Sequence, residues 1–170
     1  MIVAVGSRFT GGLSDHFGHR LFLVLGSTLA AIACAWLALA LEDFWLGVMA
    51  PLILLSVAMT MVISPLTTAV MNAVPENRAG VASSVNNAAA RVGGLLAVAA
   101  VGALAGMIYI AFADDPTARF GIMPDSEAAR VVAQESFLVA YRSAMWFAAA
   151  WAAIAAVAAA VFLDAGRSDR

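Results

Sequence analysis

The chain has 170 residues, of which 64% are hydrophobic and 12% are charged, and its formal net charge at pH 7 is −2. Soluble domains carry about 25% charged residues, so this composition leaves too little polar surface to cover a globule in water. The mean hydropathy of +0.94 therefore predicts an integral membrane protein. This slightly negative net charge gives no positive electrostatic potential that would attract nucleic acid, and it argues against nucleic acid as a partner.

Four apolar segments are long enough to cross a bilayer, which takes about 20 helical residues. In chain order they cover residues 21–41, 45–71, 80–113 and 137–163. Residues 1–9 are too few to cross, since nine helical residues span only about 13 Å. We expect them to be the last turns of a helix whose beginning is absent; the alternative is an interfacial N-terminal arm. The predicted fold class is all-α integral membrane, with four full transmembrane helices plus an N-terminal partial helix in a single domain over residues 1–170.

The segment between the third and fourth apolar runs, residues 114–136, is polar and contains proline, with room for a short amphipathic helix around 126–134. Arginine placement then predicts the orientation, because cytoplasmic loops carry an excess of basic residues. On the side of the 10–20 loop lie Arg8, Arg20, Arg78, Arg167 and Arg170, and on the other side lie Arg119, Arg130 and Arg142. The first group is the larger. We therefore expect a multi-pass protein of the cell (inner) membrane with its C-terminus in the cytoplasm.

Sites for enzymatic chemistry are not apparent in the sequence. There is no metal-ligand pattern and no phosphate-binding loop. Ser14, Asp15 and His16 are consecutive, which is the wrong geometry for a catalytic triad. The single Cys34 lies in an apolar run and is expected to be a packing residue. We predict a protein that is not an enzyme and that needs no cofactor and no metal.

One dense polar stretch, GGLSDHFGHR at residues 11–20, interrupts the apolar sequence. Its spacing resembles the short cytoplasmic loop signature of the major facilitator superfamily. In that family the loop acts as a latch between helices during the conformational cycle. The resemblance implies that Gly11, Asp15, Gly18 and Arg20 shape such a latch, with the glycines allowing a tight turn between two helices.

Two histidines depart from this family pattern. His16 and His19 stand where the family usually has Arg or Lys. Because histidine titrates near neutral pH, protonation could restore the charge of the loop. This is a hypothesis of a pH-sensitive latch, and an unchanged pH profile after replacing both histidines with Arg would remove it.

A second stretch, residues 64–94, is similar to the region between the twelfth and thirteenth helices of the fourteen-helix drug/proton antiporter branch of that superfamily. That branch often has an aromatic residue and an Arg near the outer end of its last helix, as Phe137, Tyr141 and Arg142 stand here. The resemblance implies that this chain is the C-terminal portion of a secondary active multidrug-type efflux transporter. Its partners would be the lipid bilayer, the missing N-terminal helices and a small hydrophobic or drug-like substrate.

The third apolar segment carries polar residues on one helical face. Ser84, Asn87, Arg91, Gly94 and Val98 recur at spacings of three and four, with Asn86 beside them. Arg91 lies about 16 Å along the helix from Gly80, where a charge costs roughly 2.5–3.5 kcal/mol on insertion scales. Either Ser84, Asn86, Asn87 and Arg91 line a transport path or gate, or Arg91 reaches the headgroups and the amides bridge helices.

The second apolar segment carries a stripe of hydroxyl groups, namely Ser56, Thr60, Ser64 and Thr68. We expect these to bond across helix contacts, with a polar path as the alternative. Pro65 should bend this helix.

No acidic residue falls in the middle of a span, so a proton carrier would lie outside this chain. The rival interpretation is a stand-alone small four-helix membrane protein that acts as an assembly or scaffold subunit. A passive channel ranks last, because no selectivity ring is apparent.

Overall fold

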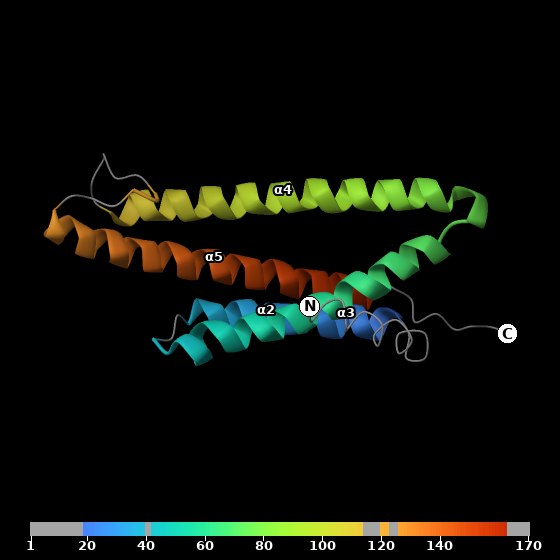
Figure 1. Ribbon diagram of the computed structural model, residues 1–170, viewed down its shortest axis with the longest axis horizontal. Coiled ribbons are helices and arrows are strands. Elements are labelled where there is room, and N and C mark those ends of the chain that lie inside the picture. Colours follow the sequence, from blue (N-terminus) through green and yellow to red (C-terminus); the bar gives the residue numbers. More distant parts are fainter. Residues whose placement is uncertain (1–18, 40–41, 114–119, 123–125, 163–170) are drawn as a thin grey trace.

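The computed structural model describes residues 19–39, 42–113, 120–122 and 126–162. Within these ranges the chain is helical and contains no strand (Figure 1). The long helices are α2 (His19–Ala38), α3 (Ala50–Asn72), α4 (Ala79–Phe112) and α5 (Glu127–Phe162). A π-helical turn η1 (Trp45–Met49) leads into α3, and a 3-10 turn η2 (Glu76–Arg78) leads into α4.

Four helices of the described chain are long and apolar enough to cross a membrane, which confirms the predicted fold class. They cover Arg20–Ala38, Trp45–Met71, Glu76–Phe112 and Ala129–Val161. The predicted partial helix at residues 1–9 lies outside the described residues.

The start of α5 differs from the sequence-based expectation. The helix begins at Glu127 instead of residue 137, and the short helix expected around 126–134 is its first part. Ser126 marks this start, because its hydroxyl oxygen accepts a hydrogen bond of 3.3 Å from the backbone N–H of Ala129. Hydropathy indicates where a helix leaves lipid and not where it ends, since Glu, Gln and Arg are good helix formers. With 36 residues, α5 is about 54 Å long.

Helix α2 packs between α3 and α5 through small side chains. Ala33 of α2 and Ala58 of α3 are both 0% exposed. At Gly26, α2 lies close to α3, since a Cβ atom there would lie 2.7 Å from the Val62 side chain and 3.0 Å from the Ala58 carbonyl oxygen. Lipid tails are as apolar as leucine, so such close packing provides most of the attraction between these helices.

Helix α3 changes direction in its second half. Pro65 lies inside the helix and is fully buried. Because proline has no backbone N–H, it removes one helical hydrogen bond and favours a bend. Figure 1 shows the second half of α3 leaving α2 and rising toward the start of α4.

The hydroxyl groups of α3 bond within their own helix. Thr60 donates to the Ser56 carbonyl at 2.9 Å, and Thr68 donates to the Ser64 carbonyl at 3.2 Å. Ser56 makes the same contact with Leu52 at 2.9 Å. These bonds to the carbonyl four residues earlier satisfy the hydroxyls locally. The hydroxyl groups of Ser56, Thr60 and Thr68 therefore donate within α3, and not to a neighbouring helix as expected from the sequence.

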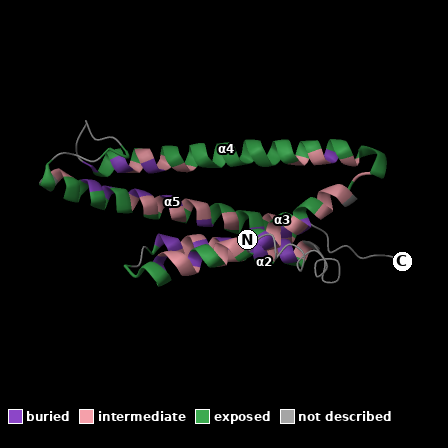
Figure 2. Ribbon diagram, in the orientation of Figure 1, coloured by how far each residue is buried: buried purple, intermediate pink, exposed green. Residues whose placement is uncertain are grey.

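Helix α4 contacts α5 only along its C-terminal part. Their shared core consists of Ala105, Tyr109, Ala113, Ala133, Ala140 and Ala144. In contrast, residues 87–100 of α4 are all exposed, and Figure 2 shows this stretch as an almost unbroken exposed band. The α4 helix is thus packed near its C-terminal end and stands away from the described helices along its middle.

Candidate functional site

The middle of α4 presents the polar face that the sequence predicts. At 100° per residue, Ser84, Asn87, Arg91 and Gly94 fall on one side of the helix, and all four are exposed. This side is continuous with the one that packs on α5 farther along, where Ala105 is buried. The polar face therefore points to the same side as the α5 contact, in a part of α4 that the described helices do not cover.

Arg91 lies deep along this helix. It is 12 residues from Ala79, the first residue of α4, which corresponds to about 18 Å. Its guanidinium makes no hydrogen bond and no ion pair with any other residue in the described part of the chain. A charge at this depth needs water, an anionic partner or a backbone carbonyl, and α2, α3 and α5 do not provide one.

The polar neighbours of Arg91 are not equivalent. The Ser84 hydroxyl donates to the Gly80 carbonyl at 2.9 Å, so its proton is already used within α4. Asn86 is half-buried, whereas Asn87 is exposed one turn before Arg91. Asn87 and Arg91 are therefore the groups of this face best placed to meet a solute or a facing helix.

Two arginines join α2 and α5 at opposite ends of their antiparallel contact. At the start of α2, the Arg20 guanidinium donates to the Ala160 carbonyl in the last turn of α5. Near the other end, Arg142 of α5 donates to the Leu39 carbonyl, just beyond α2, at 3.5 Å. Helix C-termini leave carbonyls free and carry partial negative charge, so each arginine stabilises the end of the other helix.

The spacing of these contacts matches one membrane thickness. Arg20 and Leu39 are about 28 Å apart along α2, and Arg142 and Ala160 are about 27 Å apart along α5. The hydrocarbon core of a bilayer is about 30 Å thick. Sequence reasoning assigned Arg20 to a loop latch but identified neither carbonyl partner. The available signal was that Arg20 and Leu39 are separated along the sequence by nearly the same number of residues as Arg142 and Ala160.

Replacing Arg20 with Gln should lower the stability of the bundle by about 1–2 kcal/mol, because a charged hydrogen bond to a helix C-terminus is lost. Unfolding by SDS, followed by circular dichroism, measures this effect. The matched control is Arg78→Gln in the exposed η2 turn. An equal loss for both variants would contradict the assignment.

The other residues predicted for the loop, Gly11, Asp15 and Gly18, lie outside the described residues, as does His16. His19 begins α2. The pH hypothesis for the two histidines remains a prediction.

Within the described ranges, no group of three or more His, Cys, Asp or Glu residues could hold a metal ion. The candidate site offers an amide and a guanidinium on an apolar helix. Such groups can bind or pass a polar solute within a membrane.

The family model of the Major Facilitator Superfamily matches residues 1–170. The chain belongs to the major facilitator superfamily. No curated protein and no solved structure matches it. The family and the four candidate spans together indicate a multi-pass membrane protein that takes part in transport. Membership in a family of transporters also points away from enzymatic activity.

Proposed function

We propose that this major facilitator chain is the C-terminal part of a secondary active, multidrug-type efflux transporter of the fourteen-helix drug/proton antiporter branch. The observation that supports it best is the uncovered polar face of α4, with Arg91 at its centre. A helix with an arginine far inside the hydrocarbon must face protein or a water-filled cavity. In the proposed transporter, a second bundle of helices faces this side of α4 across the transport path.

The proposed mechanism is alternating access, in which two bundles rock about a central site and expose it to each side in turn. Asn87 and Arg91 face that site, and Asn86 and Ser84 support the same surface. Helices α2, α3 and α5 move together, because small residues and the two arginine contacts hold them closely. The loop before α2, together with Arg20 in the first turn of α2, acts as the latch.

In this proposal, the group that carries the proton lies outside the described helices. Helices α2, α3 and α4 contain no acidic residue, and those of α5, Glu127 and Glu135, lie in its first nine residues. In this proposal the proton carrier belongs to the facing bundle. The substrate is a small hydrophobic or drug-like molecule, and the protein lies in the cell (inner) membrane with its C-terminus in the cytoplasm.

Inverted membrane vesicles from cells that express the native gene test this function. When energised, they should accumulate ethidium, and a protonophore should release it, because export from the cell becomes uptake into an inverted vesicle. The control is vesicles from a strain without the gene. Equal uptake in both strains, or uptake that a protonophore does not change, would argue against proton-driven export.

A second candidate is a stand-alone four-helix subunit, and the same uncovered face of α4 favours it. In that case the face pairs with α4 of a second copy. Gly94→Cys in a Cys34→Ala background tests the choice by oxidative cross-linking in membranes. A disulfide-linked homodimer favours the subunit, and a monomer that still transports ethidium favours the transporter.

A further inference from the structure

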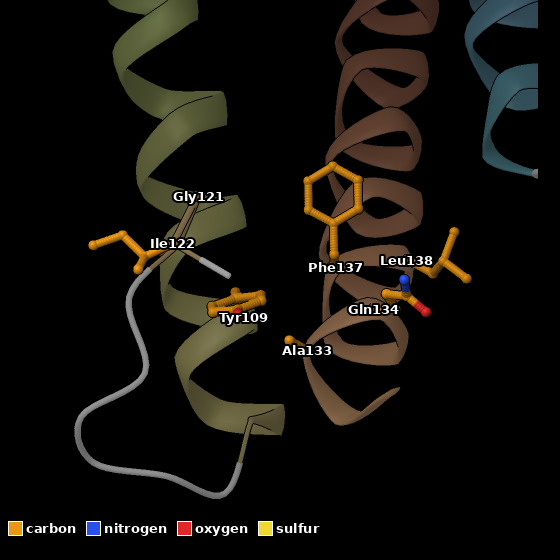
Figure 3. A pocket seen from close by; sticks show the side chains of 7 residues that line it. All are labelled: Tyr109, Gly121, Ile122, Ala133, Gln134, Phe137 and Leu138. Carbon is orange, nitrogen blue, oxygen red and sulfur yellow. The ribbon is translucent and has the colours of Figure 1, made fainter. Parts of the chain in front are cut away.

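A cavity of about 460 Å³ lies beside the C-terminal end of α4, whereas the polar face lies nearer the start of that helix. Tyr109 lines it from α4, Ala133, Gln134, Phe137 and Leu138 line it from α5, and Gly121 lines it from the segment between the two helices (Figure 3). Its volume falls in the range of small-molecule sites, about 300–1,000 Å³. Arg91 and Tyr109 are about 27 Å apart along α4, so this cavity is separate from the proposed transport path.

Two aromatic rings that line this cavity, Tyr109 and Phe137, are both in contact with a third ring, Phe120. The centroids of Tyr109 and Phe120 are 5.5 Å apart with an interplanar angle of 83°. Those of Phe120 and Phe137 are 5.8 Å apart and nearly parallel, at 21°. Figure 3 shows the Tyr109 ring extending from α4 into the space beside α5, and Phe137 standing on α5. Rings held edge-on and stacked in this way present surfaces suited to another flat aromatic ring.

The Tyr109 hydroxyl is a buried polar group beside the cavity. Tyr109 is only 4% exposed, yet its hydroxyl makes no hydrogen bond within the described part of the chain. Buried hydroxyls nearly always have a partner, and a group without one is costly. A ligand with an acceptor atom would satisfy it. The exposed Gln134 amide, also part of the lining, supplies a further donor and acceptor.

The cavity lies beyond the membrane-spanning contact of α2 with α5. Its α5 residues, 133–138, precede Arg142 by four to nine positions, or about 6–14 Å. Figure 1 shows the ends of α4 and α5 at their connection extending past the neighbouring ends of α2 and α3. The cavity is therefore at the level where lipid tails give way to headgroups, which amphipathic aromatic molecules also prefer.

We propose that this cavity binds a neutral, planar aromatic molecule carrying a hydrogen-bond acceptor, with its ring against Phe137 and Tyr109 and its acceptor on the Tyr109 hydroxyl. Among the residues that the structure describes, those that line the cavity carry no charge, which suits a neutral ligand. This site goes beyond the proposed transport function, and its binding does not depend on transport.

The test uses the protein in lipid nanodiscs and 6-fluoroquinoline as the probe, followed by fluorine NMR line broadening. The wild type should bind the probe saturably, whereas empty nanodiscs should show only partitioning. Tyr109→Phe keeps the ring and removes the hydroxyl, and it should weaken binding about three- to tenfold. Phe137→Ala should weaken binding by at least about tenfold, because a whole aromatic wall is lost.

The matched control is Phe147→Ala, which removes another ring of α5 that pairs with Trp151 at 6.1 Å, away from the cavity. This variant should bind as the wild type does. Equal affinity of the wild type, Tyr109→Phe and Phe137→Ala would overturn the proposal. So would broadening no greater than in empty nanodiscs, which is the result expected if a lipid chain fills the cavity. Because no transport is measured, failure here leaves the export assay unaffected.

Discussion

Replacing Arg91 with Leu should reduce protonophore-sensitive ethidium uptake roughly 10- to 150-fold, the loss expected when one charged hydrogen bond to the facing bundle disappears. The same change should not harm insertion, because an arginine at this depth opposes insertion on its own. Uptake into inverted vesicles, normalised to the amount of protein in the membrane, measures the first effect. A normal amount of membrane protein with lost uptake is the expected combination.

The matched control for Arg91 is Arg78→Leu, since Arg78 lies in the exposed η2 turn just before α4. This variant should transport at nearly the wild-type rate. Arg91→Lys should recover part of the activity, because it keeps the charge and loses the planar fork. Wild-type uptake by Arg91→Leu would show that the guanidinium only reaches the headgroups and that it takes no part in transport.

Replacing Gly26 with Leu should destabilise the α2–α3 contact by about 1–3 kcal/mol, or more if the helices cannot separate. The first added carbon would already lie 3.0 Å from the Ala58 carbonyl oxygen, which belongs to the α3 backbone and cannot turn aside. Helix content against SDS concentration measures the loss, and transport should fall with it.

Gly102→Leu on α4 is the matched control, because no atom lies within 4 Å of the Cβ position there. It should leave the SDS midpoint nearly unchanged. If both glycine variants shift the midpoint equally, α2 and α3 do not approach each other at Gly26 as the structure indicates.

Hydropathy predicted the existence and order of the membrane helices, because an apolar run of this length has only one way to satisfy its backbone in lipid. It did not predict where α5 begins. The residues from Glu127 to Ser136 mix polar and apolar side chains, so the sequence predicted only a separate short helix there, whereas the backbone continues it into α5. Likewise, the spacing of Thr60 and Thr68 placed both on one face of α3 but did not show that their hydroxyls bond to their own helix.

The candidate site was partly predictable for a similar reason. Helical periodicity places Asn87 and Arg91 on one face whatever surrounds them. That α5 packs on α4 near Ala105 and leaves Arg91 uncovered depends on how the helices diverge, which no local pattern encodes. The aromatic cavity was missed because Tyr109, Phe120 and Phe137 come from two helices and a connecting segment, and their sequence spacing carries no signal.

Thiol accessibility along α4 tests most directly whether its polar face meets water inside the membrane. In a Cys34→Ala background, Asn87→Cys and Gly94→Cys place a thiol on this face, and Ala89→Cys and Leu96→Cys place one on the opposite side. In native membranes, a charged methanethiosulfonate reagent should modify the first pair and spare the second. Modification of neither pair, or of both pairs equally, would contradict a water-filled path along this helix.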